Sequence, residues 1–217
     1  MLSNIFFDLD GTLTDSKEGI VKCYRYALDK LNCPYTVELK DDSVIGPPLR
    51  VIFRKILGSS DEVLIEKVVA IYRERFSTVG LFENKVYPGI PELLSALHKK
   101  SFGLFVVTTK PKIYAEKIIE HFHLSPFFSN IYGSELGGRF DNKADLIMFV
   151  LSNRNLTAEE TVMIGDKKED IIAGKTNRIK TIGVTYGYGS QREIMDAAPD
   201  YICNNPQEIQ LTLMSIR

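Results

Sequence analysis

The sequence predicts an α/β protein, with a parallel sheet covered by helices on both faces and an all-helical segment inserted after the first strand. Three observations support this fold class. Short apolar runs recur along the chain, and amphipathic helical patterns lie between them. The alternation of the two patterns is interrupted only over residues 15–86, where helical patterns follow one another.

The expected strands are apolar at successive positions rather than at alternating ones, which is typical of strands buried on both faces. Helical patterns separate them, and this order indicates βαβ units. The expected strands are "NIFFDL", "GLFVVTT", "NIYGS", "TVMIGD", "KTIGVTY" and "DYIC", and the expected helices span about 89–100, 111–122, 143–153, 168–177, 190–197 and 205–215.

Residues 15–86 carry helical patterns without a convincing strand. Asp15 with Glu18, and Ser59 with Glu62, have the spacing of capping boxes at helix starts. The break "IGPPLR" precedes another helix, expected at about 48–57. We therefore expect two domains, a sheet domain of residues 1–14 and 87–217 and a small all-α domain of residues 15–86.

The composition is typical of a water-soluble globular protein, with 44% hydrophobic and 25% charged residues. A net charge of −1 provides no basic field for nucleic acid or an anionic membrane. No apolar run approaches the roughly 18 residues of a membrane span, and the N-terminus does not resemble a signal peptide. The three cysteines are widely spaced and indicate a reducing compartment, so we expect a cytoplasmic protein.

The first expected strand ends in two acidic residues, Asp8 and Asp10, followed by Gly11. Side chains alternate along an extended chain, so both carboxylates point roughly the same way. Ligand sites of open α/β sheets form at the carboxyl ends of the strands, and Gly11 would let the backbone turn sharply and approach a ligand. The alternative is a turn in which an aspartate caps the following segment.

A second strand, "TVMIGD", also ends in an aspartate, Asp166, and Asp170 follows four residues later. Asp170 alone is explained as a first-turn acid that favours the helix dipole, but Asp166 is not. If this strand lies beside the first one, three or four carboxylates converge and their repulsion requires a cation. Ligands that are all oxygen atoms suit Mg²⁺.

Two further segments place polar groups at expected strand or helix ends. Thr108 and Thr109 follow the apolar run "LFVV", where a hydroxyl could donate to an anionic oxygen, although threonine is also common in strands. Lys143 lies in the expected first turn of a helix, where a cation opposes the macrodipole. A partner elsewhere, such as a carboxylate or a phosphate, would explain it, and a solvated surface lysine is the alternative.

Together these segments resemble the haloacid dehalogenase superfamily. "FDLDGTLTDS" resembles its DxDGT motif, Thr108 its second motif, Lys143 its third and "IGDKKED" its GDxxxD motif. "GPPL", "TTKP" and "GVTYGYGS" resemble the phosphoglycolate phosphatase-like subgroup, which includes predicted 5′-nucleotidases. The resemblance implies a Rossmann-like core with a mobile helical cap, formed here by residues 15–86.

The resemblance also implies roles for individual residues. Asp8 would be the nucleophile and Asp10 the general acid and then base, while Thr108 and Lys143 would hold phosphoryl oxygens. Asp8, the backbone carbonyl of Asp10, and Asp166 would bind Mg²⁺. Asp170 would support the metal or orient Lys143. Thr109 and Gly11 are further candidates for substrate binding, as is Arg50 of the helical segment, whose alternative is an exposed helix residue.

The resulting hypothesis is a Mg²⁺-dependent phosphatase that acts on a small phosphomonoester such as phosphoglycolate or a nucleoside monophosphate. The second aspartate favours a phosphatase or a phosphomutase, because a halide leaving group needs no proton. A β-phosphoglucomutase-like phosphotransferase and a non-catalytic module that binds a phosphate ligand are the alternatives. We expect a small-molecule substrate, no nucleic acid or membrane partner, and a monomer or weak homodimer.

Overall fold

The computed structural model describes residues 2–34, 39 and 42–216. The chain divides into two compact units, which we call the sheet unit (Met1–Asp15 and Val86–Arg217) and the helical unit (Ser16–Lys85). The domain boundaries expected from the sequence differ from this division by one residue at each crossing. Each unit is considered by itself below.

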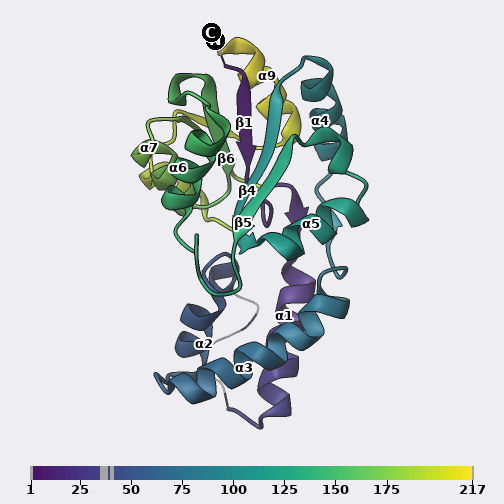
Figure 1. Cartoon of the computed structure of the whole chain (residues 1–217), viewed down its shortest axis with the longest axis vertical. Helices are drawn as coiled ribbons and strands as arrows, with labels where there is room; N and C mark the ends of the chain where they lie inside the picture. The colour runs from purple at the N-terminus through teal and green to yellow at the C-terminus, as the bar shows by residue number, and fades with distance from the viewer. Residues whose placement is uncertain (1, 35–38, 40–41, 217) are drawn as a thin grey trace. The chain divides into compact units, whose positions relative to one another are not determined.

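The sheet unit is built on a parallel sheet (Figure 1). Within the described residues, six strands pair in the order β5-β4-β1-β6-β7-β8. β1 lies in the middle, with Phe7 paired to Val106 of β4 on one side and to Ile164 of β6 on the other. The strands are β1 (Asn4–Phe7), β4 (Gly103–Pro111), β5 (Asn130–Ser134), β6 (Thr161–Gly165), β7 (Lys180–Val184) and β8 (Tyr201–Cys203).

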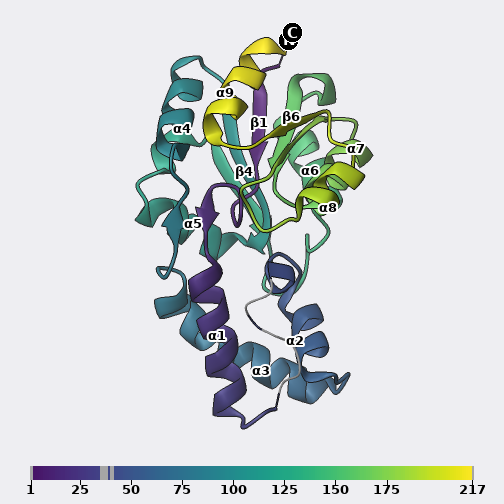
Figure 2. The same ribbon diagram turned by 180° about the vertical axis from the view of Figure 1, so that it is seen from behind.

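Helices cover both faces of this sheet. Figures 1 and 2 show α6 (Lys143–Arg154) and α7 (Lys168–Thr176) on one face and α4 (Ile90–Lys99) and α9 (Pro206–Ser215) on the other. The other α-helices described in the unit are α5 (Lys112–His121) and α8 (Gln191–Asp196), and short 3₁₀ helices span Ser125–Phe127 and Ala158–Glu160. Burial on both faces explains why the strands are continuously apolar. The predicted α/β class with a Rossmann-like parallel sheet is confirmed.

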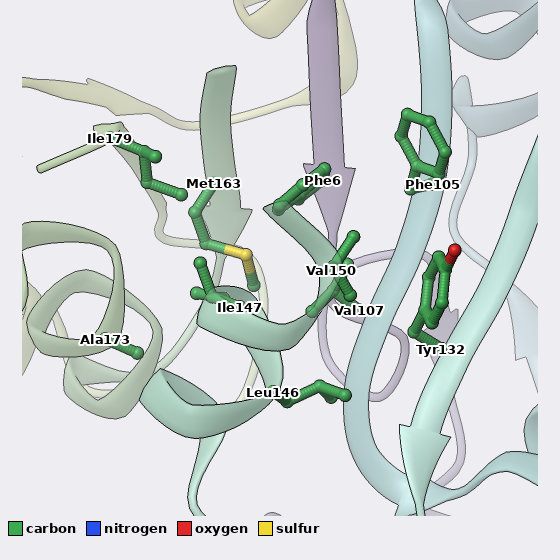
Figure 3. Packing of buried hydrophobic residues seen from close by; sticks show 10 residues of the cluster. All are labelled: Phe6, Phe105, Val107, Tyr132, Leu146, Ile147, Val150, Met163, Ala173 and Ile179. Carbon is green, nitrogen blue, oxygen red and sulfur yellow. The ribbon is translucent and has the colours of Figure 1, made fainter. Parts of the chain in front are cut away.

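The core between the sheet and α6 is closely packed (Figure 3). Phe6 of β1 and Phe105 of β4 meet edge to face, with ring centroids 5.6 Å apart. Ile147 and Val150 of α6 lie in the same cluster and are fully buried. Contacts of this kind fix the face of the sheet on which α6 lies, and therefore the position of the first residue of α6, Lys143.

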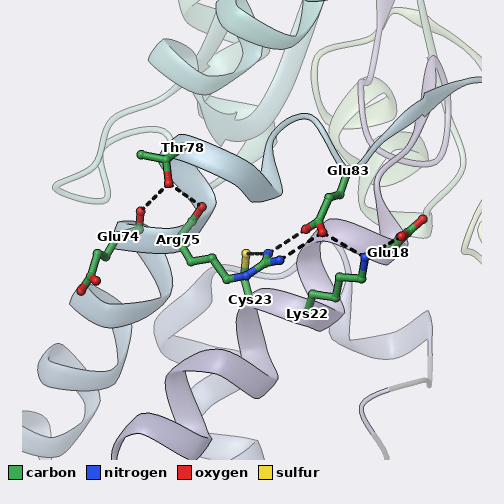
Figure 4. Close-up of polar contacts among 7 residues, drawn as sticks. All are labelled: Glu18, Lys22, Cys23, Glu74, Arg75, Thr78 and Glu83. Atoms are coloured by element: carbon green, nitrogen blue, oxygen red, sulfur yellow. Dashed lines mark hydrogen bonds and ion pairs between the residues drawn. The ribbon is translucent and has the colours of Figure 1, made fainter.

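The helical unit contains α1 (Lys17–Lys30), α2 (Leu49–Leu57), α3 (Glu62–Arg75) and a π-helical turn, Phe76–Gly80. Figure 4 shows an ion-pair network in which Arg75 donates two hydrogen bonds to Glu83, at 2.7 and 3.0 Å. Lys22 pairs with the same carboxylate at 2.9 Å. This network joins α1 and the end of α3 to the segment that leaves the unit.

Two predicted helix starts in this unit are wrong. α1 begins after Ser16, and Asp15 instead accepts a hydrogen bond from the Tyr188 hydroxyl at 2.8 Å. α3 begins after Asp61, whose carboxylate accepts from two backbone N–H groups, whereas Ser59 accepts only from the Asp61 N–H. Capping-box spacing therefore located these helix starts only to within two residues. At α3 the Asp61 carboxylate takes the capping role predicted for Ser59, whereas at α1 the Ser16 side chain makes no capping hydrogen bond.

Two short strands were not expected from the sequence. β2 (Thr14–Asp15) and β3 (Lys85–Val86) form a two-stranded sheet at the points where the chain passes from one unit to the other. Each has two residues, too few for a periodic pattern. In the part of the chain that the structure describes, none of the helices combines the length and the apolar character needed to cross a membrane.

Replacing Phe6 by Ala should lower the free energy of unfolding by about 3–5 kcal/mol, because the ring is fully buried and leaves a cavity. The matched control is Met148→Ala, on the solvent side of α6 with 59% exposure, which should change stability by no more than about 0.5 kcal/mol. Urea denaturation of the two variants provides the measurement. Equal shifts of their midpoints would contradict the described core.

Candidate active site

The candidate site lies at the carboxyl ends of β1 and β6. Asp8 follows β1 directly, and its N–H donates to the Ile164 carbonyl at 2.9 Å, which extends the pairing of the two strands by one residue. Asp166 follows the last residue of β6. Because these parallel strands are neighbours and end at the same edge of the sheet, the two aspartates are brought together although they are far apart in sequence.

Three carboxylates converge at this edge. Oxygen atoms of Asp8, Asp166 and Asp170 all lie within 4.8 Å of one another, and all three residues are buried. Lys143 Nζ lies 2.9 Å from Asp8 Oδ1 and also forms a short hydrogen-bonded ion pair with Asp170. Site residues predicted on three separate segments of the sequence thus lie side by side in the sheet unit.

The electrostatics of this cluster favour an added cation. Burial is the main cause that raises the pKa of Asp166, and the charges of Asp170 and Asp8 raise it further. Burial is the largest single influence on Lys143 and lowers its pKa, but the charges of Asp170 and Asp8 and the hydrogen bonds to both outweigh it together, so this pKa is raised. Three negative groups face one positive group. The donors are all carboxylate oxygens and match the preferences of Mg²⁺.

The loop after β7 holds Asp166 in place. The Tyr188 N–H donates to Asp166 Oδ2 at 2.7 Å, and the Thr12 hydroxyl donates to Oδ1 at 3.2 Å. Gly11, with φ of 85°, and Gly187 both approach so closely that a Cβ atom on either would clash with the Asp166 side chain. These two glycines let backbone pack directly against the carboxylate.

Asp170 is fixed by its helix. It is the third residue of α7, and its Oδ2 accepts a hydrogen bond from the Lys167 N–H at 3.0 Å. Its other oxygen, Oδ1, accepts from Lys143. The N-terminal turn of α7 therefore supplies both a favourable dipole and an N–H donor to this acid, as the sequence indicated.

Asp10 points to a different partner. Its Oδ2 lies 2.5 Å from Lys110 Nζ, and both side chains are largely buried. Its Oδ1 is also buried and has no hydrogen-bond partner among the described residues. The carboxylate of Asp10 is not part of the group formed by Asp8, Asp166 and Asp170. The metal role predicted for Asp10 concerned its backbone carbonyl, and it stays a prediction.

The threonines lie before the end of their strand. β4 continues to Pro111, and its pairing with β5 becomes irregular between Thr108 and Pro111. The expectation that the strand ends at the threonines is wrong by two residues. The buried Thr108 hydroxyl oxygen accepts from the Lys110 N–H at 3.2 Å, which leaves its O–H free to donate elsewhere. The Thr109 carbonyl accepts from the Ser134 hydroxyl at 2.6 Å.

Arg50 belongs to α2 of the helical unit, where its guanidinium forms a two-bond ion pair with Glu66 of α3. Its guanidinium is thus engaged within its own unit. The predicted contact between Arg50 and a substrate stays a prediction.

Among the described residues, Lys110, Thr12 and Tyr188 contribute side chains or N–H groups to the site without having been predicted as site residues, as do Gly187 and the Lys167 N–H. Lys110 and Tyr188 belong to the motifs "TTKP" and "GVTYGYGS", and Thr12 follows the DxDG sequence. Their roles follow from contacts with residues far away in the sequence. Lys110 and Thr12 are separated from their partners by 100 residues or more, and the Tyr188 N–H is separated from Asp166 by 22. Their positions in or beside these motifs were the only sign in the sequence that they belong to the site. The sequence did not show which residue each of them contacts.

Comparison with known proteins identifies the family. Residues 5–184 match the family model described as haloacid dehalogenase-like hydrolase. The chain belongs to this family. A crystal structure of a predicted phosphatase from Clostridium acetobutylicum covers all of both chains, with a TM-score of 0.92 and 39% sequence identity. The resemblance stated from the sequence is confirmed.

Relatives in this family have different names. A 5′-nucleotidase of Pseudomonas aeruginosa is 41% identical over 98% of this chain and 96% of its own length. The tyrosine-protein kinase PtkA of Mycobacterium tuberculosis is 35% identical over 85% of this chain and 62% of its own length. A phosphoglycolate phosphatase of Vibrio cholerae is 29% identical over 93% of this chain and 92% of its own length. The predicted enzyme class, a haloacid dehalogenase-type hydrolase with phosphatases among its relatives, is confirmed.

Adding Mg²⁺ to metal-free protein should raise its melting temperature, because a ligand that binds only the folded state stabilises it, by about 2.7 kcal/mol at 100 times Kd. Asp166→Asn should lose this gain while keeping a similar melting temperature in EDTA, since its charge is unfavourable among Asp170 and Asp8. Asp145→Asn, an exposed aspartate in the first turn of α6, is the control and should respond as the parent does. An unchanged response of Asp166→Asn to Mg²⁺ would contradict the site.

Proposed function

We propose that the protein is a Mg²⁺-dependent phosphatase that hydrolyses a small phosphomonoester through an aspartyl-phosphate on Asp8. The observation that best supports this function is the convergence of Asp8 with Asp166, Asp170 and Lys143 at one sheet edge. Phosphoryl transfer depends mainly on positioning and on neutralising negative charge, and this group of side chains is suited to both.

Asp8 is the proposed nucleophile. One of its carboxylate oxygens attacks the phosphorus atom, and the bond from phosphorus to the ester oxygen breaks as the new bond forms. The leaving alkoxide takes a proton from the carboxylic acid of Asp10, which becomes a carboxylate. A covalent intermediate replaces one difficult hydrolysis by two easier steps.

The second step regenerates the enzyme. A water molecule attacks the phosphorus atom, its proton passes to the Asp10 carboxylate, and the bond to Asp8 breaks. Inorganic phosphate leaves, Asp8 is again a carboxylate and Asp10 is again protonated. The same side chain thus acts first as general acid and then as general base, which requires it to lie beside the nucleophile but not to bond to phosphorus.

The buried carboxylates fit Mg²⁺ by number, spacing and charge. Asp8, Asp166 and the Asp10 carbonyl would hold the ion, with Asp170 in support. When bound, Mg²⁺ would offset the repulsion between the Asp8 carboxylate and the phosphate dianion.

Lys143 and Thr108 are proposed to hold the phosphoryl oxygens. Lys143 Nζ already lies beside Asp8 Oδ1, where the phosphoryl group would be transferred. The Thr108 O–H is available because its oxygen accepts, rather than donates, in the bond to the Lys110 N–H. Thr109 and the close backbone approach at Gly11 are proposed as further contacts to the substrate.

The leaving group is proposed to be a nucleoside, so that a nucleoside 5′-monophosphate is the substrate class. Similarity supports this choice, since the 5′-nucleotidase is 41% identical to this chain and the phosphoglycolate phosphatase 29%. The helical unit, residues 15–86 in our prediction, is proposed to serve as a cap that binds the leaving group. For Arg50 to contribute to substrate binding, its guanidinium would have to break the ion pair with Glu66 and bind the substrate instead.

The alternatives differ in product. A phosphomutase would convert a sugar 1-phosphate to a 6-phosphate faster than it releases phosphate, and a binding module would bind phosphate ligands without turnover. All the proposed catalytic positions are occupied by competent residues, which favours an enzyme. We also propose a cytoplasmic location, supported by three cysteines that are not joined in disulfides, and a monomer or weak homodimer.

Asp8→Asn should reduce phosphate release from p-nitrophenyl phosphate by at least about 10³-fold, because the amide is a far weaker nucleophile. EDTA should abolish the activity of the parent and Mg²⁺ should restore it. A panel of phosphomonoesters, including nucleoside 5′-monophosphates, phosphoglycolate and sugar 1-phosphates, would identify the leaving group.

Asp145→Asn is again the matched control and should keep parental activity, since Asp145 is exposed in the first turn of α6. Rapid acid quenching during turnover should trap phosphate on the parent protein but not on Asp8→Asn. Undiminished activity of Asp8→Asn would exclude the proposed nucleophile, and preferential sugar-phosphate isomerisation would favour the mutase.

A further inference from the structure

We propose that Lys110 is a positioning residue for proton transfer by Asp10. Its ammonium holds Asp10 Oδ2, so that Asp10 Oδ1 exchanges the proton with the leaving oxygen and then with water. This inference rests on the proposed function of Asp10. Lys110 acts through Asp10 and does not itself exchange the proton.

The pair joins Lys110 of β4 to Asp10 of the loop that follows β1, and these two strands are neighbours in the sheet. Lys110 Nζ and Asp10 Oδ2 are 2.5 Å apart, although the residues are separated by 100 positions in the sequence. The side chains of Lys110 and Asp10 are only 6% and 13% exposed. A pair this sheltered from water is screened far less than a surface pair.

The backbone around Lys110 is fixed on both sides. Its N–H donates to the Thr108 hydroxyl oxygen at 3.2 Å, and the preceding carbonyl, that of Thr109, accepts from Ser134. The carbonyl of Lys110 packs on Gly133, where a Cβ atom would lie 2.5 Å from it. These contacts fall in the irregular pairing between Thr108 and Pro111. Irregularities of this kind redirect a side chain, here toward β1.

The two oxygens of Asp10 have different surroundings. Oδ2 is held by Lys110, whereas Oδ1 is buried and lacks a hydrogen-bond partner within the described residues. A buried polar atom without a partner is costly, and a substrate oxygen or a water would satisfy it during turnover. Oδ1 is therefore the oxygen of Asp10 that remains available to a reacting oxygen atom.

The charge of Lys110 also assists the first step. When Asp10 gives its proton to the leaving alkoxide, a carboxylate forms in a sheltered environment, and the adjacent ammonium stabilises it. Loss of Lys110 should therefore matter most for leaving groups that need a proton. An alkoxide is strongly basic and needs one, whereas p-nitrophenolate leaves readily without it.

The test compares two substrates in Lys110→Met. The value of kcat/KM reports the step in which the leaving group departs, and it should fall about 10–100-fold for the alkyl phosphomonoester hydrolysed best in the panel. For p-nitrophenyl phosphate it should fall less than about threefold. A merely structural role of Lys110 would lower both values equally. Lys110→Gln, which keeps a donor without the charge, is the second variant if Lys110→Met does not fold, and the same selective loss is expected.

A double-mutant cycle with Asp10→Asn tests whether Lys110 acts through Asp10. Adding Lys110→Met to Asp10→Asn should cause less than about a twofold further loss on the alkyl substrate, because the group that Lys110 positions is already disabled. The control is Lys112→Met, a half-exposed lysine at the start of α5 that pairs loosely with Glu116 at 3.6 Å, and it should behave as the parent does on both substrates.

The outcomes separate the inference from the proposed function. If Asp10→Asn shows the selective loss on the alkyl substrate but Lys110→Met lowers both substrates equally, or adds fully to Asp10→Asn, the role of Lys110 is overturned and the function stands. If the parent releases no phosphate, or Asp10→Asn affects both substrates alike, the proposed role of Asp10 itself fails.

Discussion

The arrangement of this site depends on like charges held together at the ends of parallel strands. Asp8, Asp166 and Asp170 are buried within a few ångströms of one another, and each ionised carboxylate out of water costs several kcal/mol. Lys143 offsets part of this cost by pairing with two of them. What remains is an excess of negative charge, which a divalent cation would neutralise. The same excess would repel a phosphate dianion if no cation were bound.

The fold stabilises this arrangement because groups outside the cluster hold each of the three aspartates in position. Asp170 is anchored by the first turn of α7, and Asp166 by the backbone of Tyr188 and the hydroxyl of Thr12. Asp8 is held by the continued pairing of β1 with β6. The bonds that hold Asp8 and Asp170 come from strand pairing and from the N-terminus of α7, so the core that packs α6 and α7 on the sheet also positions these charges.

The Asp10–Lys110 pair stands apart from this cluster, and the separation has a chemical meaning. In the proposed function Asp10 gains and loses a proton in each turnover, and such a group cannot be fixed permanently as a carboxylate by a metal. Placing Asp10 two residues after Asp8 brings it to the same edge of the sheet, and a single lysine, rather than several cations, lies against its Oδ2. The proposed nucleophile, Asp8, and the proposed proton donor, Asp10, are thus close in sequence but have different electrostatic surroundings.

The sequence by itself determined the α/β class, most strand and helix spans, and the residues that form the acidic cluster. It did so because strands buried on both faces are continuously apolar, and because charged residues at the ends of such strands are costly enough to stand out. It located the starts of α1 and α3 only approximately, because Asp61 rather than Ser59 caps α3 and α1 begins after Ser16, whose side chain makes no capping hydrogen bond. Only the tertiary structure decided that Lys110 faces Asp10, that Tyr188 and Thr12 hold Asp166, and that Arg50 is paired with Glu66. Those pairings depend on strand order and loop paths that bring distant residues together, and a local sequence pattern does not contain that information.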